Sequence, residues 1–323
     1  MDPGFLDVLE KHPENADRAK NMLSILKRGP ISPFISWHQG RPAHIYELSS
    51  FHTQADRNGG KELCGGTFLN PGSWDAALLL VTLSSMKHII DGHGKIVYAL
   101  VRPPGHHAQP TQADGYCFLN NEGLAVQLAL DGGCGKGNGT AEGFYHSDKV
   151  LTISLHMNRG SWGPSNPQGG TVDELGEGEG FGYNLNIPLP NGTGVKGHGY
   201  AMQHLVVPAI EKFEPDMMVL VVGQDSSAVI DPNGRQCLTM EGYREIGLTI
   251  HGMADKYCNE WTALPIACTR LLKLCSILAP LLYDPIAYYP EDDSFPAKVI
   301  EAIKKRLYHF LKMLSWGLTL FCF

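Results

Sequence analysis

The sequence has no Cys-x-x-Cys pair, the spacing on which zinc ribbons and many redox sites depend. Its eight cysteines are scattered along the chain: Cys64, Cys117, Cys134, Cys237, Cys258, Cys268, Cys275 and Cys322. A small secreted protein stabilised by disulfides has a much denser set. The cysteine pattern therefore argues against a zinc ribbon and against a disulfide framework, and it favours a reducing compartment.

Positive charge is also scarce in this sequence. With 26 Lys and Arg residues against 33 Asp and Glu, the formal net charge is −7 at pH 7. Proteins that bind nucleic acids need clustered Lys and Arg side chains to neutralise phosphates. We therefore expect no direct binding to nucleic acid.

Long hydrophobic runs are missing from most of the chain. The segment from Met1 to Lys20 is charged and has no apolar run, so we expect no secretory signal there. A membrane-spanning helix needs about 20 apolar residues, and no segment before residue 300 provides them. Residues 296–323 begin as an amphipathic helix and end in an apolar run that Lys312 interrupts. They predict a docked or aberrant tail rather than a membrane anchor.

What the chain does have is the pattern of an α/β protein. Its 323 residues, 43% of them hydrophobic, suffice for one large domain, or for two small ones. Apolar runs rich in β-branched residues predict buried parallel strands at Lys95–Val101, Lys149–His156 and Asp216–Gly223. Helical periodicity occurs at Ser73–Asp91, Asn121–Leu130, Tyr200–Phe213 and Met240–Tyr257. This alternation predicts a parallel sheet with helices on both faces.

The loops after the predicted strands are where chemistry is expected, because open α/β sheets bind ligands beyond the carboxyl ends of their strands. The first loop reads Arg102-Pro-Pro-Gly-His106-His107, and Asp114-Gly-Tyr-Cys-Phe118-Leu-Asn120-Asn121 follows shortly after. Two imidazoles with near-neutral pKa can take a proton from water and return it to a leaving amine. An isolated His-His pair, however, is more often just a pair of loop histidines.

The whole segment from Arg102 to Asn121 resembles the active-site loop of the histone deacetylase family, class II type, and of the related acetylpolyamine amidohydrolases. The resemblance covers most of residues 12–257 and includes Gly137–Phe144, Thr152–His156, Trp162–Ser165 and Val222–Asp225. Residues Asp284–Asp292 are similar to the C-terminal part of plant class II-like members. The resemblance implies an arginase/deacetylase-like fold and zinc-dependent hydrolysis of N6-acetyl-lysine in histones or other proteins.

The resemblance also implies roles for single residues. His106 and His107 would be the general base and acid, and Asp225 would be a zinc ligand. Carboxylates bind Zn²⁺ at about 2.0–2.2 Å, and zinc lowers the pKa of bound water to about 7. Without the resemblance, Asp225 would be read as a loop cap for Ser226 and Ser227.

Further residues of the resemblance concern the substrate and a second ion. Phe118 and Trp162, with Gly115, would line a narrow tunnel for the aliphatic stem of acetyl-lysine. Aromatic side chains are more often simple core residues, so the tunnel depends on the resemblance. Ser154 and Leu155 match positions that support a structural monovalent cation, such as K⁺.

The chain departs from the family at the metal site. The family has an Asp-x-His pair at the end of an inner strand just before the Gly-Asn-Gly-Thr stretch, but here Lys136 runs directly into Gly137. About one strand with its loop, roughly ten residues, is missing. Asp131 and His146 have the wrong spacing to replace the pair. We therefore expect weak or no zinc binding, and unpaired ladder groups on the strands beside the deletion.

A second departure follows Tyr257. The family has a Glu-Gly-Gly-Tyr stretch whose tyrosine stabilises the oxyanion, whereas the block near 258–278 does not match it. Losing one oxyanion donor typically costs about 10²- to 10³-fold in rate. We accordingly predict one deacetylase-like domain over residues 1–295, with internal deletions, followed by a C-terminal tail over residues 296–323.

Three functions stay open at this point. The first is a lysine deacetylase of the nucleus and cytoplasm, impaired in this chain, which acts on acetylated proteins or peptides in chromatin regulation and joins corepressor-type complexes. The second is an acetylpolyamine amidohydrolase, and the third is a non-catalytic deacetylase-like protein that binds acetylated partners. None of them involves a membrane.

Overall fold

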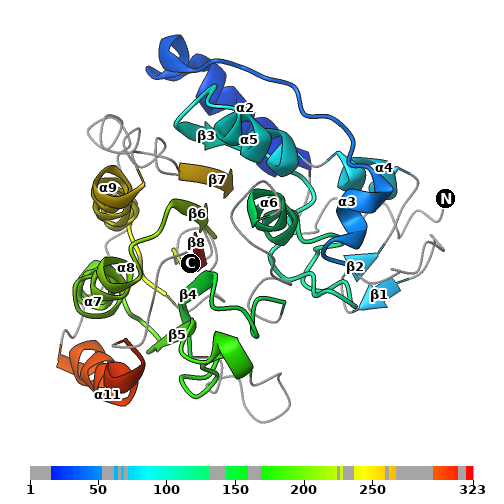
Figure 1. Cartoon of the computed structure of the whole chain (residues 1–323). Coiled ribbons are helices and arrows are strands. Elements are labelled where there is room, and N and C mark those ends of the chain that lie inside the picture. The colour runs from blue at the N-terminus through cyan, green and yellow to red at the C-terminus, as the bar shows by residue number, and fades with distance from the viewer. Residues whose placement is uncertain are drawn as a thin grey trace.

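The structure is a computed structural model that describes residues 16–52, 62–64, 67–68, 72–79, 81–130, 143–158, 169–223, 226–227, 236–258, 262–266, 294–311 and 318–322. Its centre is a six-stranded sheet with helices packed on both of its faces (Figure 1). A small antiparallel pair, β1 (Glu62–Cys64) and β2 (Thr67–Phe68), lies apart from this sheet. The α/β fold predicted from the sequence is therefore confirmed.

The strands of the main sheet follow the order β3-β7-β6-β8-β4-β5, and every neighbouring pair is parallel. Their bounds are Ile96–Tyr98 (β3), Val150–Met157 (β4), Asn184–Leu189 (β5), Met217–Val221 (β6), Thr262–Ile266 (β7) and Leu318–Cys322 (β8). The three strands predicted from apolar runs correspond to β3, β4 and β6. The sequence patterns did not identify β5, β7 or β8.

Helices cover the two faces of the sheet in separate layers (Figure 1). One layer holds α7 (Val195–Ala201), the π-helical turn η5 (Met202–Val206), α8 (Val207–Phe213), α9 (Met240–Tyr257) and α11 (Ser294–Leu311). The other layer includes α5 (Val81–Ile90) and α6 (Asn121–Ala129). The remaining described helices are α2 (Ala16–Arg28), η1 (Ser32–Phe34), α3 (Ile45–Ser49), α4 (Ser73–Leu78) and η4 (Gly178–Gly180).

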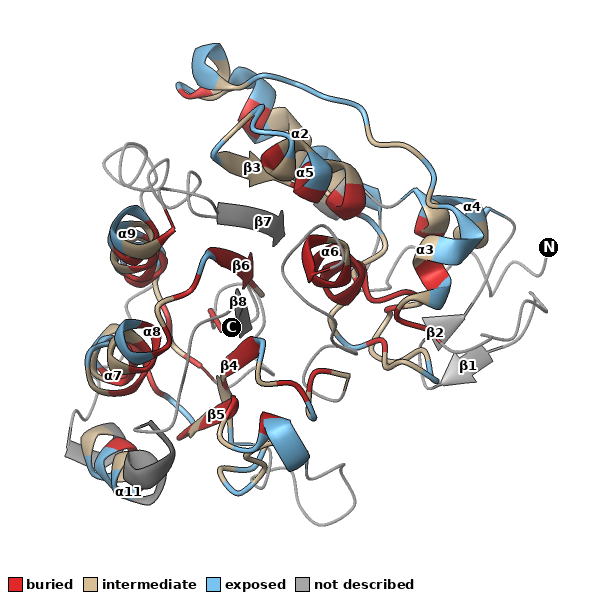
Figure 2. Cartoon of the chain, viewed as in Figure 1, coloured by how far each residue is buried: buried red, intermediate tan, exposed pale blue. Residues whose placement is uncertain are grey.

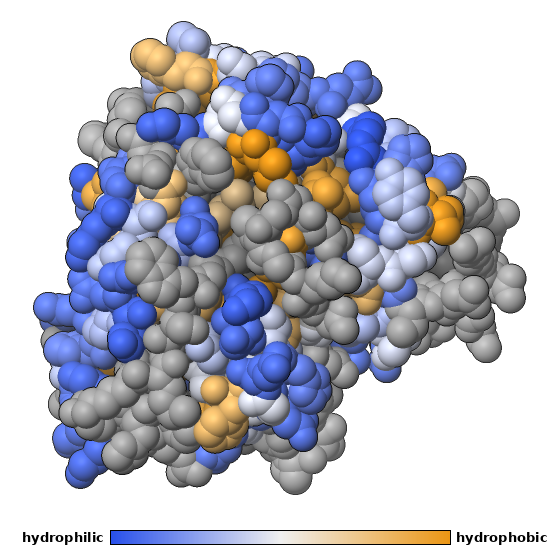
Figure 3. Space-filling view, in the orientation of Figure 1, coloured by the Kyte–Doolittle hydropathy of each residue, from blue (hydrophilic) through white to orange (hydrophobic). Residues whose placement is uncertain are grey.

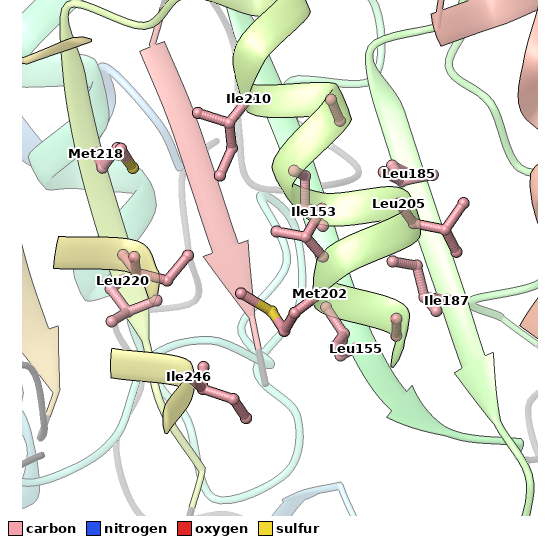
Figure 4. Packing of buried hydrophobic residues seen from close by; sticks show 14 of the residues in the cluster. Ile153, Leu155, Leu185, Ile187, Met202, Leu205, Ile210, Met218, Leu220 and Ile246 are labelled. Carbon is pink, nitrogen blue, oxygen red and sulfur yellow. The ribbon is translucent and has the colours of Figure 1, made fainter. Parts of the chain in front are cut away.

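The strand β6 shows why this sheet needs a layer of helices on each face. All five of its residues are buried, and they alternate between two hydrophobic clusters. Met218 and Leu220 belong to the cluster under α8 and α9, while Val219 and Val221 belong to the cluster under α5 and α6. Because successive side chains of a strand point to opposite faces, a continuous apolar run can only be buried between two layers. Figure 2 shows the buried strands at the centre, and Figure 4 shows the packing of the first cluster.

The surface agrees with this core. On the face shown in Figure 3, hydrophobic residues form small separate areas among hydrophilic ones. Among the described residues, none of the helices has the length and apolar character that crossing a membrane requires. The apolar stretch near the C-terminus instead contributes β8 to the sheet.

The helix α11 of the C-terminal segment packs against the main core. Ile300 and Ile303 of α11 are buried in the main core. The expectation of unpaired ladder groups beside the deletion is wrong for β4, the first described strand after it. β4 is paired on one edge by β5 and on the other by β8. The proposed division of the chain at residue 295 stays a prediction.

Candidate active site

The predicted site residues follow strands whose carboxyl ends lie on one edge of the sheet. β3, β4 and β6 all belong to the parallel sheet and therefore end on the same side. The His106-His107 loop follows β3, His156 lies at the end of β4, and the loop towards Asp225 follows β6. This edge is the candidate active site.

The two histidines of the first loop stand in direct contact. Their ring centroids lie 4.1 Å apart and the ring planes meet at 72°, an edge-to-face arrangement. His106 is half-buried and His107 is exposed to solvent. The pair therefore has one imidazole partly covered by the protein and one open to solvent.

Gly115 lies directly against the second histidine. A Cβ atom at this position would be 2.5 Å from Cδ2 of His107, and the backbone φ of Gly115 is +50°. Only glycine permits both the close approach and this left-handed conformation without strain. Gly115, predicted to contact substrate, is thus also the residue that gives the His107 ring its space.

Replacing Gly115 with alanine is expected to displace the His107 ring and lower the Tm by about 2–6 °C, because a left-handed alanine costs about 1–2 kcal/mol. Histidine NMR resonances would report the displacement. Gly192→Ala is the matched control, since Gly192 has a φ of +78° but no atom within 4 Å of the added Cβ. Unchanged His107 resonances in Gly115→Ala would contradict the close contact.

Two asparagines of the same motif form hydrogen bonds to the backbone of the His106-His107 loop. Nδ2 of Asn120 donates to the carbonyl oxygen of Ala108 at 2.7 Å, and Nδ2 of Asn121 donates to the carbonyl oxygen of Pro103 at 3.2 Å. Oδ1 of Asn120 also caps α6 by accepting from the amide of Gly123 at 2.7 Å. The loop with the His pair is thereby fixed to the start of a buried helix.

A further histidine, His52, forms a hydrogen bond with the backbone amide of Asn120. Nε2 of His52 accepts a hydrogen bond from the Asn120 amide at 2.9 Å, so the proton of the neutral ring sits on Nδ1, which faces the Pro110 carbonyl at 3.4 Å. Burial lowers the pKa of His52, which keeps the ring neutral. No sequence pattern had pointed to His52 or to the roles of both asparagines. An Asn-Asn pair before an apolar helix is an N-cap signal that could have found Asn120.

The carboxyl group of Glu122 is an unexpected neighbour of the loop. Glu122 has no exposed surface, and both its carboxylate oxygens lack a hydrogen-bond partner among the described residues. Oε2 lies 2.7 Å from the place where a Cβ of Gly105 would stand, one residue before His106. Burial raises the pKa of Glu122 to about 7. Glu122 was not predictable as a site residue from the sequence, because an acid in the first turn of a helix is usually solvated.

The predicted substrate tunnel is described only in part. Phe118 is half-buried and packs against a cluster that includes Leu48, Phe51 and Leu119. This contact is also what a simple core aromatic would make. Trp162 lies outside the described residues, so the aromatic pair stays a prediction.

The residues proposed for the monovalent cation lie at the end of β4. Nε2 of His156 donates to the carbonyl oxygen of Gly170 at 2.8 Å, which leaves Nδ1 to accept from Oγ of Ser154 at 2.9 Å. The Ser154 hydroxyl hydrogen is therefore engaged in a hydrogen bond with His156. The side chain of Leu155 is buried in the core.

The described residues do not fit a zinc site. Among them, no three His, Cys, Asp or Glu side chains come together in a way that could hold a metal ion. Asp225 and residues 131–142 lie outside the described part of the chain. The exposed His146 instead lies 3.8 Å from the carboxylate of Glu177. The strand that pairs with both β4 and β6 reads Leu-Thr-Leu-Phe-Cys, which contains no carboxylate or imidazole.

Cys258 is not a substitute nucleophile. It is buried at the end of α9, and its thiol donates to the carbonyl oxygen of Pro215 at 3.0 Å. Burial raises the pKa of this thiol to about 12, so the thiolate is absent near neutral pH. Cys117 and Cys237 are free cysteines as well.

Comparison with known proteins places this geometry in a family. A histone deacetylase domain model matches residues 12–265. Histone deacetylase 8 of Arabidopsis thaliana is 57% identical over 94% of this chain and 89% of its own length. A histone deacetylase-like amidohydrolase of Pseudomonas aeruginosa is 32% identical over 76% of this chain and 68% of its own. The crystal structure of the HDA15 HD domain superposes with a TM-score of 0.77 at 25% identity, covering 94% of this chain and 90% of that one.

Proposed function

This chain belongs to the histone deacetylase family. We propose that it binds N6-acetyl-lysine of proteins or peptides at the loop of His106 and His107, but hydrolyses the acetyl-lysine amide slowly. The observation that carries the proposal is the paired imidazoles at the sheet edge, 4.1 Å apart, on a loop fixed by Asn120 and Asn121. Paired imidazoles next to a substrate amide can move the two protons that amide hydrolysis requires.

The two histidines would divide the proton transfers between them. One neutral imidazole takes a proton from the attacking water, and the other, in its protonated form, gives a proton to the departing lysine amine. Gly115 keeps the space beside His107 open, and Phe118 would line the path of the alkyl stem. Ser154 and Leu155 would hold a monovalent cation such as K⁺ beneath the site.

A zinc ion held here would supply activation of the water and polarisation of the acetyl carbonyl. The described residues of this chain do not fit that metal, and Asp225 is the single predicted ligand. A catalytic zinc normally has three protein ligands. We infer that zinc binding is weak, that the oxyanion tyrosine is missing, and that turnover is correspondingly low.

The finer features of the proposal come from the sequence resemblance. They are membership of the class II type, acetylated proteins or peptides as partners, association with corepressor-type complexes in chromatin regulation, and residence in the nucleus and cytoplasm. The net charge of −7 argues against direct contact with nucleic acid.

Purified, folded chain is expected to hold much less than one zinc per molecule by elemental analysis, and to deacetylate an acetyl-lysine peptide at least about 10²-fold more slowly than Arabidopsis histone deacetylase 8 prepared in the same way. His107→Phe should reduce any remaining turnover further, whereas the surface variant Lys149→Gln should not. One tightly held zinc per chain together with rapid turnover would refute the proposed impairment.

Two other functions can be tested in the same preparation. Turnover of acetylputrescine above that of the peptide would favour an acetylpolyamine amidohydrolase, a possibility that fits the amidohydrolase among the relatives. Binding of the acetylated peptide without hydrolysis, measured by titration of metal-free protein, would favour a binding protein that keeps the loop but not the chemistry.

A further inference from the structure

The strand β8 pairs with two strands that come far earlier in the chain. Its five residues, Leu318 to Cys322, pair in register with Val150 to Ser154 of β4 and with Met217 to Val221 of β6. Figure 4 shows this strand, in faint red, between the strands that carry Met218 and Leu220 on one side and Ile153 and Leu155 on the other. In the described sheet, β8 lies between β4 and β6 and pairs with both.

The two flanking strands require a partner at this place. The residues of β4 and β6 that face β8 are buried, with the single exception of the partly exposed Ser154. A buried backbone N–H or C=O without a partner is unfavourable, and two such edges would face each other if the slot were open. We use the term central slot for the space between β4 and β6.

The position of the central slot indicates which strand β8 replaces. Strands that follow each other in a chain usually lie side by side in a sheet. β5, the next strand after β4, occupies one edge of β4. A strand that preceded β4 would therefore occupy the other edge, which is the edge that β8 takes. The strand predicted to be missing between Lys136 and Gly137 is one that precedes β4.

The helix before β8 fixes the tail close to the slot. Ile300 and Ile303 of α11 are buried in the core under α7 and α8. The Tyr200 hydroxyl donates to Glu301 at 3.1 Å, and Nζ of Lys304 donates to Nδ1 of His204 at 3.5 Å. Because only residues 312–317 separate α11 from β8, the effective concentration of the strand at its own slot is high. The same chain is thus favoured over a second copy as its source.

We propose that the central slot is a strand-binding site, and that the C-terminal segment Leu318–Cys322 occupies it in place of the missing internal strand. The tail thereby completes the sheet and holds the β4 end with Ser154 next to the β6 end. It brings no carboxylate or imidazole to this edge, so it restores the scaffold without restoring metal ligands. This inference concerns the fold and does not depend on the proposed function.

Hydrogen exchange of the unmodified full chain tests the proposal directly. The amides of residues 319–322 are expected to exchange as slowly as those of β4 and β6, within about 10-fold, because all three strands open together. Exchange of the tail at the rate of an exposed peptide, while β4 and β6 stay protected, would overturn the proposal.

A pair of cysteine variants tests the register. Neighbouring strands lie about 4.7–4.9 Å apart, within the Cα separation that a disulfide accepts. Ser154→Cys should form a disulfide with Cys322 under mild oxidation, whereas Thr152→Cys, which is in register with Leu320, should not. Peptide mass spectrometry identifies the bond. A 154–322 bond found only between two chains, or no such bond in the Ser154→Cys variant, would overturn the proposal.

A third comparison asks whether the strand's backbone is required. Leu320→Pro removes one ladder amide and is expected to lower the Tm by roughly 5–10 °C and speed exchange in both β4 and β6. Leu320→Val keeps the amide and serves as the control. Equal Tm values and equal exchange in the two variants would show that β8 does not occupy the slot.

Discussion

Replacing Glu122 with glutamine is expected to stabilise the protein by about 3 kcal/mol at pH 8 and to leave its stability nearly unchanged at pH 4. The carboxyl group is fully buried and has no hydrogen-bond partner among the described residues. Burial raises its pKa from 4.5 to about 7. Glutamine has the shape of the protonated acid but cannot ionise, so the variant isolates the effect of the charge.

The pH window follows from the two pKa values of Glu122. Below pH 4.5 the carboxyl group is protonated in the folded and the unfolded chain, so it adds no pH dependence. As the pH rises from 4.5 to about 7, the unfolded chain releases this proton while the folded chain retains it, and stability falls. Above about pH 7 the loss is complete, at about 1.4 kcal/mol for each pKa unit.

Urea unfolding at pH 4, 6 and 8 measures this effect. Glu47 offers a control of opposite sign, because its hydrogen bond with Arg41 lowers the pKa of the Glu47 carboxyl group. Glu47→Gln should therefore cost up to about 1 kcal/mol at pH 8 and nothing at low pH, since this ion pair is partly exposed. If Glu122→Gln were as stable as the unmodified protein at pH 8 and less stable than it at pH 4, the raised pKa of a buried, unpartnered Glu122 carboxyl group would be contradicted.

Replacing Asn120 with alanine is expected to destabilise the protein by about 3 kcal/mol and to loosen the loop of His106 and His107. The variant loses the cap of α6, worth about 1 kcal/mol, and leaves the buried Ala108 carbonyl unpaired, at about 1–3 kcal/mol. Urea unfolding measures the first effect. Hydrogen exchange over residues 102–109 measures the second.

Thr239→Ala is the matched control for Asn120. Oγ1 of Thr239 caps α9 by accepting from the Gly242 amide at 3.2 Å, and α9 covers the other face of the sheet from α6. This variant should cost about 1 kcal/mol without changing exchange over residues 102–109. If both variants speed exchange there equally, Asn120 supports the fold in general and does not position the loop.

The strands of the sheet show which elements a local sequence pattern can predict. The strands β3, β4 and β6 were predictable because apolar runs with β-branched residues have one stable environment, between two layers of helices. β5 was not, because its sequence mixes asparagine, leucine and proline. Asn184 and Asn186 lie buried there, and their amides donate to the Glu174 and Thr171 carbonyls. Only those tertiary partners make a buried polar strand stable.

The candidate site divides in the same way. The sequence by itself determined the family and the position of His106 and His107 after a strand, because these depend on residue identity and spacing. The loss of the Asp-x-His pair stays a prediction from the sequence. Only the tertiary structure decided the burial of Glu122, the support of the loop by His52 and the insertion of β8 between β4 and β6. Each of these joins segments that are distant in the chain, or depends on what covers a side chain, and local periodicity records neither.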